Sequence, residues 1–328
     1  MLLGLVIIMD DEFEIFDISG VDPSNFEPMG TKSKFWFKDS DETRKLFKST
    51  VVLDKQGNTI ERKGEDWAEK IVCEIAKLLE IPYANYELGI YMGEYGVIAD
   101  NFVDENDEMV HGNQIVAHIL NIVGKKIGTA RNSNHHISRV LVALDKIVVN
   151  KPKGWDSLPG IKTAPEFFCG YVMLDALVSN QDRHDENWGM IVSSDGRRFL
   201  APSYDHAASL GRNESDELRE RRLNTKDSGQ SVEHYVTKAK SQFIDLETKR
   251  RIKAMSAFML FSGVHPSASL AWLERLKKVP EDAFRSIIDR VPACRMSDVS
   301  KDFAYQIIQA NRKNLLACSE FIIELSKE

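Results

Sequence analysis

The first third of the chain alternates between short apolar runs and polar breaks. Between residues 35 and 55, the runs FWFK, RKLFK and TVVLD are interrupted by the polar stretch DSDE, a pattern typical of strands joined by a hairpin turn. The next segment places apolar side chains three and four residues apart from Trp67 to Leu78, which predicts an amphipathic helix that ends before Pro82. Two more strands complete a small predicted sheet with one helix packed on it, at 86–92 and 95–99.

From about residue 113 the apolar spacing becomes that of helices, and only residues 189–205 keep a β-like pattern. The polar segment 212–231 is a predicted flexible loop. The predicted fold class is therefore α+β and bilobal, with a small antiparallel β lobe over residues 1–112 and a larger, mostly helical lobe over residues 113–328. The expected helices lie at 113–123, 136–148, 165–179, 231–241, 245–262, 266–278, 280–290 and 299–326.

Composition narrows the function classes. The 328 residues are 43% hydrophobic and 28% charged, which suits a globular chain with a large core. The formal net charge of −7 argues against nucleic acid as a partner, because affinity for a phosphate backbone needs clustered Lys and Arg. The sequence thus favours a chain whose main partner is not a polyanion.

Cysteines and the N-terminal run bear on localisation. The four cysteines are scattered without a CxxC pair, so neither a zinc site nor a disulfide framework is expected and a reducing cytoplasm is the predicted compartment. The opening MLLGLVIIM lacks a basic region before it, leads into DDEFE and is too short to span a membrane. It is predicted to be a strand or a packed arm, with no membrane as partner.

The segment NQDRHDENW, residues 180–188, carries the clearest chemistry. Phosphoryl transfer needs a carboxylate that orients the attacking hydroxyl and a nearby oxygen ligand for a metal that neutralises phosphate charge. Asp182 and Asn187, with four residues between them, have this spacing, and Asp205 follows the β-like run RRFLAPSY as a second metal ligand. The alternative is a capped loop in which Asp182 and Asn187 only bind backbone amides.

These segments resemble a known family. SNQDRHDENW and LAPSYDHAASLG are similar to the catalytic and metal-binding segments of HipA-like serine/threonine kinases, and the DRHxxN part is also similar to phosphatidylinositol 3- and 4-kinases. The resemblance implies a protein-kinase-like fold, ATP and Mg²⁺, transfer of the γ-phosphoryl group to a protein hydroxyl, and autophosphorylation. It also implies a bacterial toxin or regulator, with an antitoxin-like partner as one option and the protein substrate unknown.

The resemblance further implies a role for individual residues. Asp182 is then the catalytic residue, with Asn187 and Asp205 as metal ligands. Lys48 matches the family's phosphate-bridging lysine, for which Lys38 is the rival, and Glu69 matches its acidic partner. The predicted nucleotide contacts are the phosphate-loop residues Gly30, Thr31, Lys32 and Ser33, together with Lys48 and the hinge residues Asp100, Asn101 and Phe102.

The sequence departs from the usual protein-kinase motifs at two places, and other functions therefore remain as alternatives. The phosphate loop has one glycine, so the G-x-G-x-x-G pattern is missing, and Asn180-Gln181 stands where ordinary protein kinases have His-Arg. The second departure favours the HipA-like or the lipid-kinase branch. The alternatives are a phosphatidylinositol-type lipid or small-molecule kinase, supported by DRHDEN, and a pseudokinase that only binds nucleotide. His184 is expected to be structural.

Overall fold

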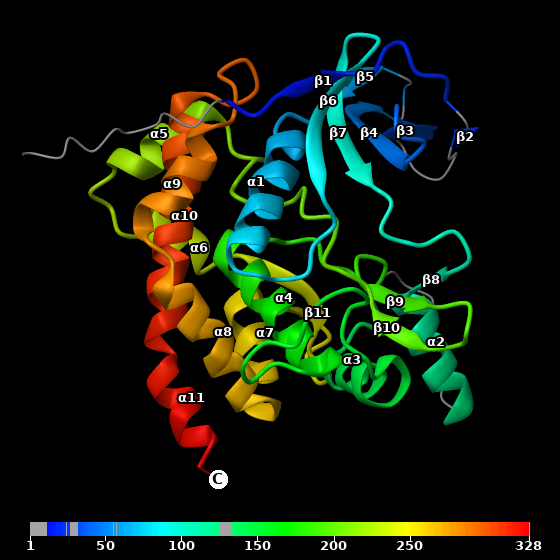
Figure 1. Ribbon diagram of the computed structural model, residues 1–328. Coiled ribbons are helices and arrows are strands. Elements are labelled where there is room, and N and C mark those ends of the chain that lie inside the picture. Colours follow the sequence, from blue (N-terminus) through cyan, green and yellow to red (C-terminus); the bar gives the residue numbers. More distant parts are fainter. Residues whose placement is uncertain are drawn as a thin grey trace, which may run out of the picture.

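The computed structural model describes residues 12–23, 25–26, 32–54, 56, 58–124 and 133–327. They form a β-rich upper lobe and a mostly helical lower lobe, with the chain crossing between the lobes after β7 (Figure 1). The opening apolar run lies outside the described residues. None of the helices in the described ranges is both long and apolar enough to cross a membrane.

The upper lobe is built on a seven-stranded sheet with the order β1-β6-β7-β4-β3-β2, in which β5 pairs with β4. All of its pairings are antiparallel except β1 with β6, which is parallel. The sheet therefore agrees with the predicted lobe but is not purely antiparallel. Its strands are β1 (Ile15–Asp17), β2 (Asn25–Phe26), β3 (Lys32–Lys38), β4 (Arg44–Leu53), β5 (Thr59–Glu61), β6 (Tyr86–Tyr91) and β7 (Glu94–Asp100).

Helix α1 (Glu65–Leu78) packs on this sheet and also joins it to the lower lobe. It begins after Gly64, whose φ of 86° suits glycine and where a Cβ would meet the Trp67 ring at 2.7 Å. Its first turn is acidic, and the Asp66 carboxylate accepts a hydrogen bond of 2.6 Å from Arg295 of the lower lobe. The Arg295 guanidinium also lies 3.8 Å from the centre of the Tyr95 ring, so the helix is held from both lobes.

The lower lobe is centred on α4 (Ala164–Val178), which is buried on all sides. Its start follows from a capping box between Thr163 and Glu166, with Pro165 in the first turn. The chain around it comprises β8 (Glu108–His111), α2 (Gly112–Ile122), α3 (Ile137–Ala143), the π-helix η1 (Leu144–Val148), β9 (Gly189–Val192), β10 (Arg198–Leu200), α5 (Asp216–Asn224), α6 (Val232–Val236), β11 (Lys240–Ile244), β12 (Arg251–Lys253), α7 (Ala254–Val264), α8 (Pro266–Lys278), α9 (Glu281–Asp289), α10 (Asp298–Ala317) and α11 (Ser319–Leu325).

Three local predictions differ from this architecture. The helix expected at 245–262 begins only at Ala254, because residues before it form the antiparallel hairpin of β11 and β12. The Asp245 carboxylate accepts a hydrogen bond from the backbone amide of Thr248 at 2.7 Å and so closes the hairpin turn. The spacing of apolar residues does not reveal a turn of this kind. The helix expected at 231–241 spans only α6, and the predicted loop 212–231 contains α5.

Strand β8 lies just before the predicted division at residue 112. It pairs antiparallel with β9, and β9 pairs with β10, in a three-stranded sheet of the lower lobe. The division into 1–112 and 113–328 remains a prediction, and strand pairing assigns β8 to the second part.

Candidate active site

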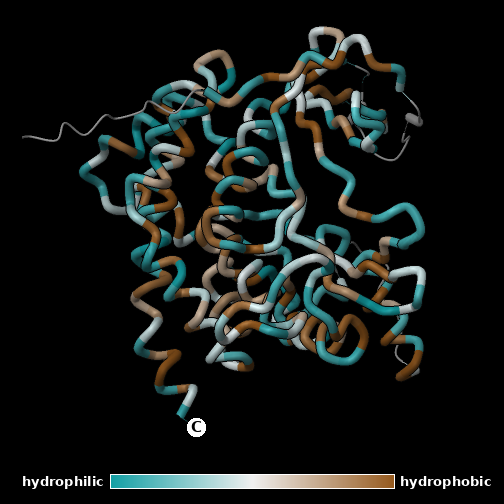
Figure 2. Tube along the Cα trace, viewed as in Figure 1, coloured by the Kyte–Doolittle hydropathy of each residue, from teal (hydrophilic) through white to brown (hydrophobic). Residues whose placement is uncertain are grey.

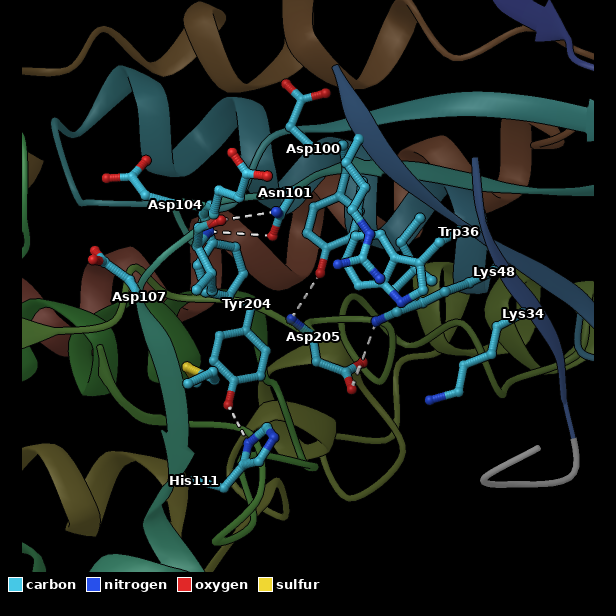
Figure 3. A pocket seen from close by; sticks show the side chains of 18 of the residues that line it. Lys34, Trp36, Lys48, Asp100, Asn101, Asp104, Asp107, His111, Tyr204 and Asp205 are labelled. Atoms are coloured by element: carbon cyan, nitrogen blue, oxygen red, sulfur yellow. Dashed lines mark hydrogen bonds and ion pairs between the residues drawn. The ribbon is translucent and has the colours of Figure 1, made fainter. Parts of the chain in front are cut away.

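A cavity of about 790 Å³ lies between the two lobes (Figure 3). Its upper wall comes from β3, β4, β6 and β7, and its lower wall from β8, the loop before β9 and the segment after β10. Residues 101–107 close one side. Residues from both lobes are therefore needed to form it.

The two-residue period of β3 and β4 explains the polar upper wall. Phe35 and Phe47 are fully buried on one face of the sheet, with ring centroids 5.4 Å apart. Because neighbouring side chains in a strand point to opposite faces, Lys34, Trp36 and Lys48 point to the other face and line the cavity. Lys34 and Lys48 are directly paired across the two strands, so the cavity has two lysines at one end.

Away from the lysines the cavity has an apolar part, although Asp100, Asp104, Glu105 and Asp107 also line it. Phe102 and Tyr204 stack with ring centroids 5.6 Å apart, and Leu46, Ala99 and Met109 lie beside them along the cavity. The Tyr204 hydroxyl donates to the Glu186 carbonyl at 2.7 Å. This fixes the ring as one wall, and a flat, partly apolar ligand would fit against it.

Lys48 and Asp205 face each other at the polar end, with 4.0 Å between the ammonium and the carboxylate. Burial alone would lower the pKa of Lys48, but the negative charges of Asp205 and Glu69 outweigh burial and raise that pKa above its ordinary value. Asp205 has φ of 60°, a strained conformation for a residue with a Cβ. Its backbone amide donates to the Tyr86 hydroxyl at 3.2 Å, which helps to hold it there.

Glu69, predicted as the partner of Lys48, lies on α1 and is nearly fully buried. Its carboxylate accepts the backbone amide of His206 at 2.7 Å. The contact links α1 directly to the residue after Asp205, while the charge of Glu69 still acts on Lys48. Glu69 therefore positions the Asp205 segment in addition to acting on the lysine.

The loop between α4 and β9 brings Asp182 and Asn187 together. The Asn187 amide donates to the Asp182 backbone carbonyl at 2.7 Å, and Asn187 lines the cavity. The Asp182 carboxylate is partly buried and receives a hydrogen bond of 3.4 Å from Gln242 of β11. His184 accepts the Glu186 backbone amide at 3.1 Å, and the structural role expected for it stays a prediction.

Arg183 and Asp175 hold this loop, and sequence reasoning missed both. The Arg183 guanidinium is fully buried and forms a two-point ion pair with Asp175 of α4, through Nε to Oδ2 and at 2.8 Å to Oδ1. It also donates to the Asn187 carbonyl at 3.2 Å and to the Ser203 hydroxyl at 2.8 Å. An acidic residue on the otherwise apolar helix FFCGYVMLDALV was the available signal for a buried partner.

The predicted hinge residues Asp100, Asn101 and Phe102 all line the cavity. The Asp100 carboxylate pairs with Lys45 at 2.8 Å, and the backbone amides of Asp100 and Asn101 already donate to the carbonyls of Asn85 and Arg44. A base that used these two amides would have to replace those hydrogen bonds. The Phe102 ring, by contrast, lines the cavity while it stacks on Tyr204.

The predicted phosphate loop can be compared with the structure only in part. Gly30 and Thr31 lie outside the described residues, and Lys32 and Ser33 are the first residues of β3. Lys34, the next residue, lines the cavity near Lys48, although sequence reasoning gave it no separate role. The rival Lys38 lies at the rim and pairs with Glu42 at 2.7 Å.

Comparison with known proteins bears on this fold and site. No family model matches the chain. The serine/threonine-protein kinase CtkA of Helicobacter pylori strain J99 is 22% identical over 259 residues, which cover 76% of this chain and 70% of CtkA. The crystal structure of this proinflammatory kinase matches with a TM-score of 0.71 at 18% identity, over 96% of this chain and 100% of that chain.

A second solved structure is HipA of Shewanella oneidensis, in a toxin–antitoxin complex with HipB and operator DNA. It matches with a TM-score of 0.56 at 11% identity, over 94% of this chain and 68% of that chain. These structures show an α+β kinase-like fold, so the predicted fold class is confirmed. With the sequence relationship to CtkA, they define the protein as an enzyme of the kinase class. CtkA is similar to this chain in sequence and fold, and HipA is similar to it in fold.

Proposed function

We propose that the protein is a HipA-like serine/threonine protein kinase that transfers the γ-phosphoryl group of ATP to a protein hydroxyl. The observation that carries the proposal is the meeting of Lys48 and Asp205, 4.0 Å apart, in one cavity with Asn187. The Lys48 ammonium can bind phosphate oxygens, and the side-chain oxygens of Asp205 and Asn187 can bind a metal ion. Together they suit a bound triphosphate in a cavity between two lobes.

The residues of the chain divide the work between the two ends of the cavity. The stacked rings of Phe102 and Tyr204 hold the base, and Lys48 with Lys34 binds the phosphates. Asp182, on the loop that Arg183 anchors, accepts a hydrogen bond from the acceptor hydroxyl and takes its proton during transfer. Because positioning and charge stabilisation provide most of the catalysis of phosphoryl transfer, the buried network below the loop is part of the machinery.

The donor atoms at this end also suit Mg²⁺. Among the described residues no group of three or more His, Cys, Asp or Glu side chains could hold a metal by itself. Mg²⁺ is ordinarily bound by one or two protein oxygen ligands and completed by substrate phosphates and water. The Asn187 amide nitrogen donates to Asp182, which leaves its oxygen as an acceptor, so Asn187 and Asp205 would hold the ion. The ion would neutralise phosphate charge during transfer.

The relatives support a narrower proposal about regulation. HipA is found in a toxin–antitoxin complex with HipB, and we extend to this chain a toxin or regulatory role, an antitoxin-like partner and autophosphorylation of its phosphate loop. A phosphate there would oppose ATP binding through the repulsion between like charges.

The test is transfer from radiolabelled ATP with Mg²⁺ to serine- and threonine-containing peptides. Asp182→Asn should lower transfer by at least about a hundredfold, because the proton acceptor is lost. Asp185→Asn makes the same chemical change three residues further on, at a carboxylate to which the proposed mechanism gives no role, and should keep activity within about twofold. Both variants are compared at equal folded concentration.

Two results would contradict the proposal. Normal transfer by Asp182→Asn would remove Asp182 from the mechanism. The same assay is run with phosphoinositide vesicles as the acceptor. If the radiolabel enters the vesicles but no peptide, the protein is a lipid kinase.

A further inference from the structure

A strongly basic hairpin lies outside the cavity. Strands β11 and β12 and the residues that join and flank them, 238–253, carry six exposed cations against two acidic residues, in a chain whose formal net charge is −7. Within the part of the chain that the structure describes, none of the six forms an ion pair with an acidic side chain. The six cations of this basic hairpin are Lys238, Lys240, Lys249, Arg250, Arg251 and Lys253.

The hairpin places like charges together at a cost to its own stability. Lys240 and Lys253 are directly paired across β11 and β12, and like charges in this position repel each other. Asp245, one of the two acids, is engaged by its own turn, where it accepts the amide and the hydroxyl of Thr248 at 2.7 and 2.8 Å. The cationic face is therefore not neutralised from within the hairpin.

The base of the basic hairpin is fixed to the core. Phe243 is fully buried and stacks on His135, with 4.4 Å between ring centroids. The Ile244 amide donates to the His135 carbonyl at 2.9 Å, and His135 accepts the Trp188 indole N–H at 3.2 Å. The charged side chains thus extend from an ordered support, which lowers the entropy lost when a ligand binds.

The basic hairpin also reaches the catalytic loop. Gln242 donates to the Gln181 carbonyl at 2.7 Å and to the Asp182 carboxylate at 3.4 Å. Lys240 lies two residues before Gln242 and is exposed, whereas Ser241 between them is buried. No residue of 238–253 lines the cavity, so the cationic surface lies beside Asp182 without being part of the nucleotide site.

We propose that the basic hairpin is the docking surface for acidic protein substrates, whose Asp, Glu or phosphorylated residues flank the acceptor hydroxyl. This rests on the proposed function, because the acceptor must reach Asp182 and a segment that does so passes the hairpin. Nucleic acid is a poorer fit. The patch is one short hairpin, and the rest of the chain is net negative and repels a long polyanion.

The first measurement is binding without ATP, by fluorescence anisotropy of a labelled peptide with a central serine flanked by glutamates. The same peptide with glutamine at those positions, and a single-stranded oligonucleotide, are the comparisons. The acidic peptide should bind about tenfold more tightly than the neutral one and should lose this advantage at high salt.

Variants locate the surface. Lys240→Glu with Lys253→Glu should abolish the preference for the acidic peptide, and it leaves the cross-strand pair like-charged, so the strands are perturbed little. Lys249→Gln with Arg250→Gln, at the unpaired tip, should weaken the preference in a hairpin whose strands are untouched. Lys313→Glu with Lys327→Glu makes the same change of charge on exposed positions near the C-terminus and should keep the preference.

The outcomes separate the two proposals. Equal binding of acidic and neutral peptides, a preference that survives in both hairpin variants, or tighter binding of the oligonucleotide would overturn the docking surface. If the acidic peptide binds as expected but the wild-type protein with Mg²⁺ and ATP phosphorylates no peptide, the docking surface stands and the proposed kinase function fails.

Discussion

A single buried arginine connects the parts of the site that come from different segments. Arg183 contacts Asp175 of α4, the carbonyl of Asn187 and the hydroxyl of Ser203. It also lies 3.2 Å from Nε2 of His206, the residue after Asp205. One guanidinium thus contacts Asn187 directly and two residues near Asp205 in the chain, Ser203 and His206, and it is not among the residues that line the cavity.

This network predicts different effects on stability and on activity. Arg183→Met leaves Asp175 as an unpaired buried charge and should lower the free energy of unfolding by about 3 kcal/mol or more. Adding Asp175→Leu removes that charge and should restore most of the stability, because buried ion pairs are often replaced by apolar residues without loss. Activity should stay low in the double variant, because Asn187 and Ser203 have still lost their donor.

The free energy of unfolding of both variants is measured by urea unfolding, and their activity by peptide phosphorylation. A double variant that regains stability and activity together would show that Arg183 matters only for folding.

At the scale of elements, the pairing of β3 with β4 decides where each lysine lies along the cavity, which Lys34, Lys38 and Lys48 all line. Lys34 and Lys38 are both on β3, but Lys34 lies opposite Lys48 and Lys38 lies opposite Arg44, at the end of the pairing. Lys38 then pairs with Glu42 in the turn, with most of its side chain exposed. Two lysines on one strand therefore have different surroundings, although both follow the same two-residue period.

This difference predicts the ranking of two matched variants. Lys34→Met should raise the KM for ATP about tenfold, because it removes one of two cations at the phosphate end. Lys38→Met removes only an exposed ion pair and should change the KM less than about twofold. The check is the dependence of initial rate on ATP concentration for both proteins. The reverse ranking would move the phosphate site towards the rim.

At the scale of the whole molecule, the stability of the fold depends on a buried side chain that must stay neutral. His135 packs between Phe243 and Trp188, and burial lowers its pKa from 6.5 to about 3. The folded protein keeps this ring neutral, whereas the unfolded chain binds a proton below pH 6.5. The unfolded state therefore gains protons as the pH falls, and stability is lost over the range from about 6.5 towards 3.

This loss of stability can be measured as the difference in the free energy of unfolding, from urea unfolding at pH 7.5 and pH 5.5. His135 should contribute about 1 kcal/mol to the fall in unfolding free energy between these values. His135→Gln keeps an acceptor for the Trp188 indole but does not titrate, so its stability should fall less over the same interval. An identical fall in both proteins would mean that other groups carry the pH dependence.

The sequence could predict the features whose residues lie close together along the chain. Apolar spacing located the upper sheet, α1 and most of the lower helices, because a helix or a strand repeats its pattern within a few residues. Asp182 and Asn187 could be read as one loop for the same reason, since only four residues separate them. The kinase-like fold class followed from these elements and from the resemblance of the segments around them.

Contacts between distant segments needed the tertiary structure. The opposition of Lys34 and Lys48 depends on the register of two strands, and the contact of Glu69 with His206 joins residues 137 positions apart. The pairing of Arg183 with Asp175 and the hairpin beside Asp182 likewise depend on how α4, β11 and the catalytic loop pack. The spacing of apolar residues along the chain determines which helices and strands form. Strand register and packing determine which side chains meet, because they bring together residues that have no fixed separation in the sequence.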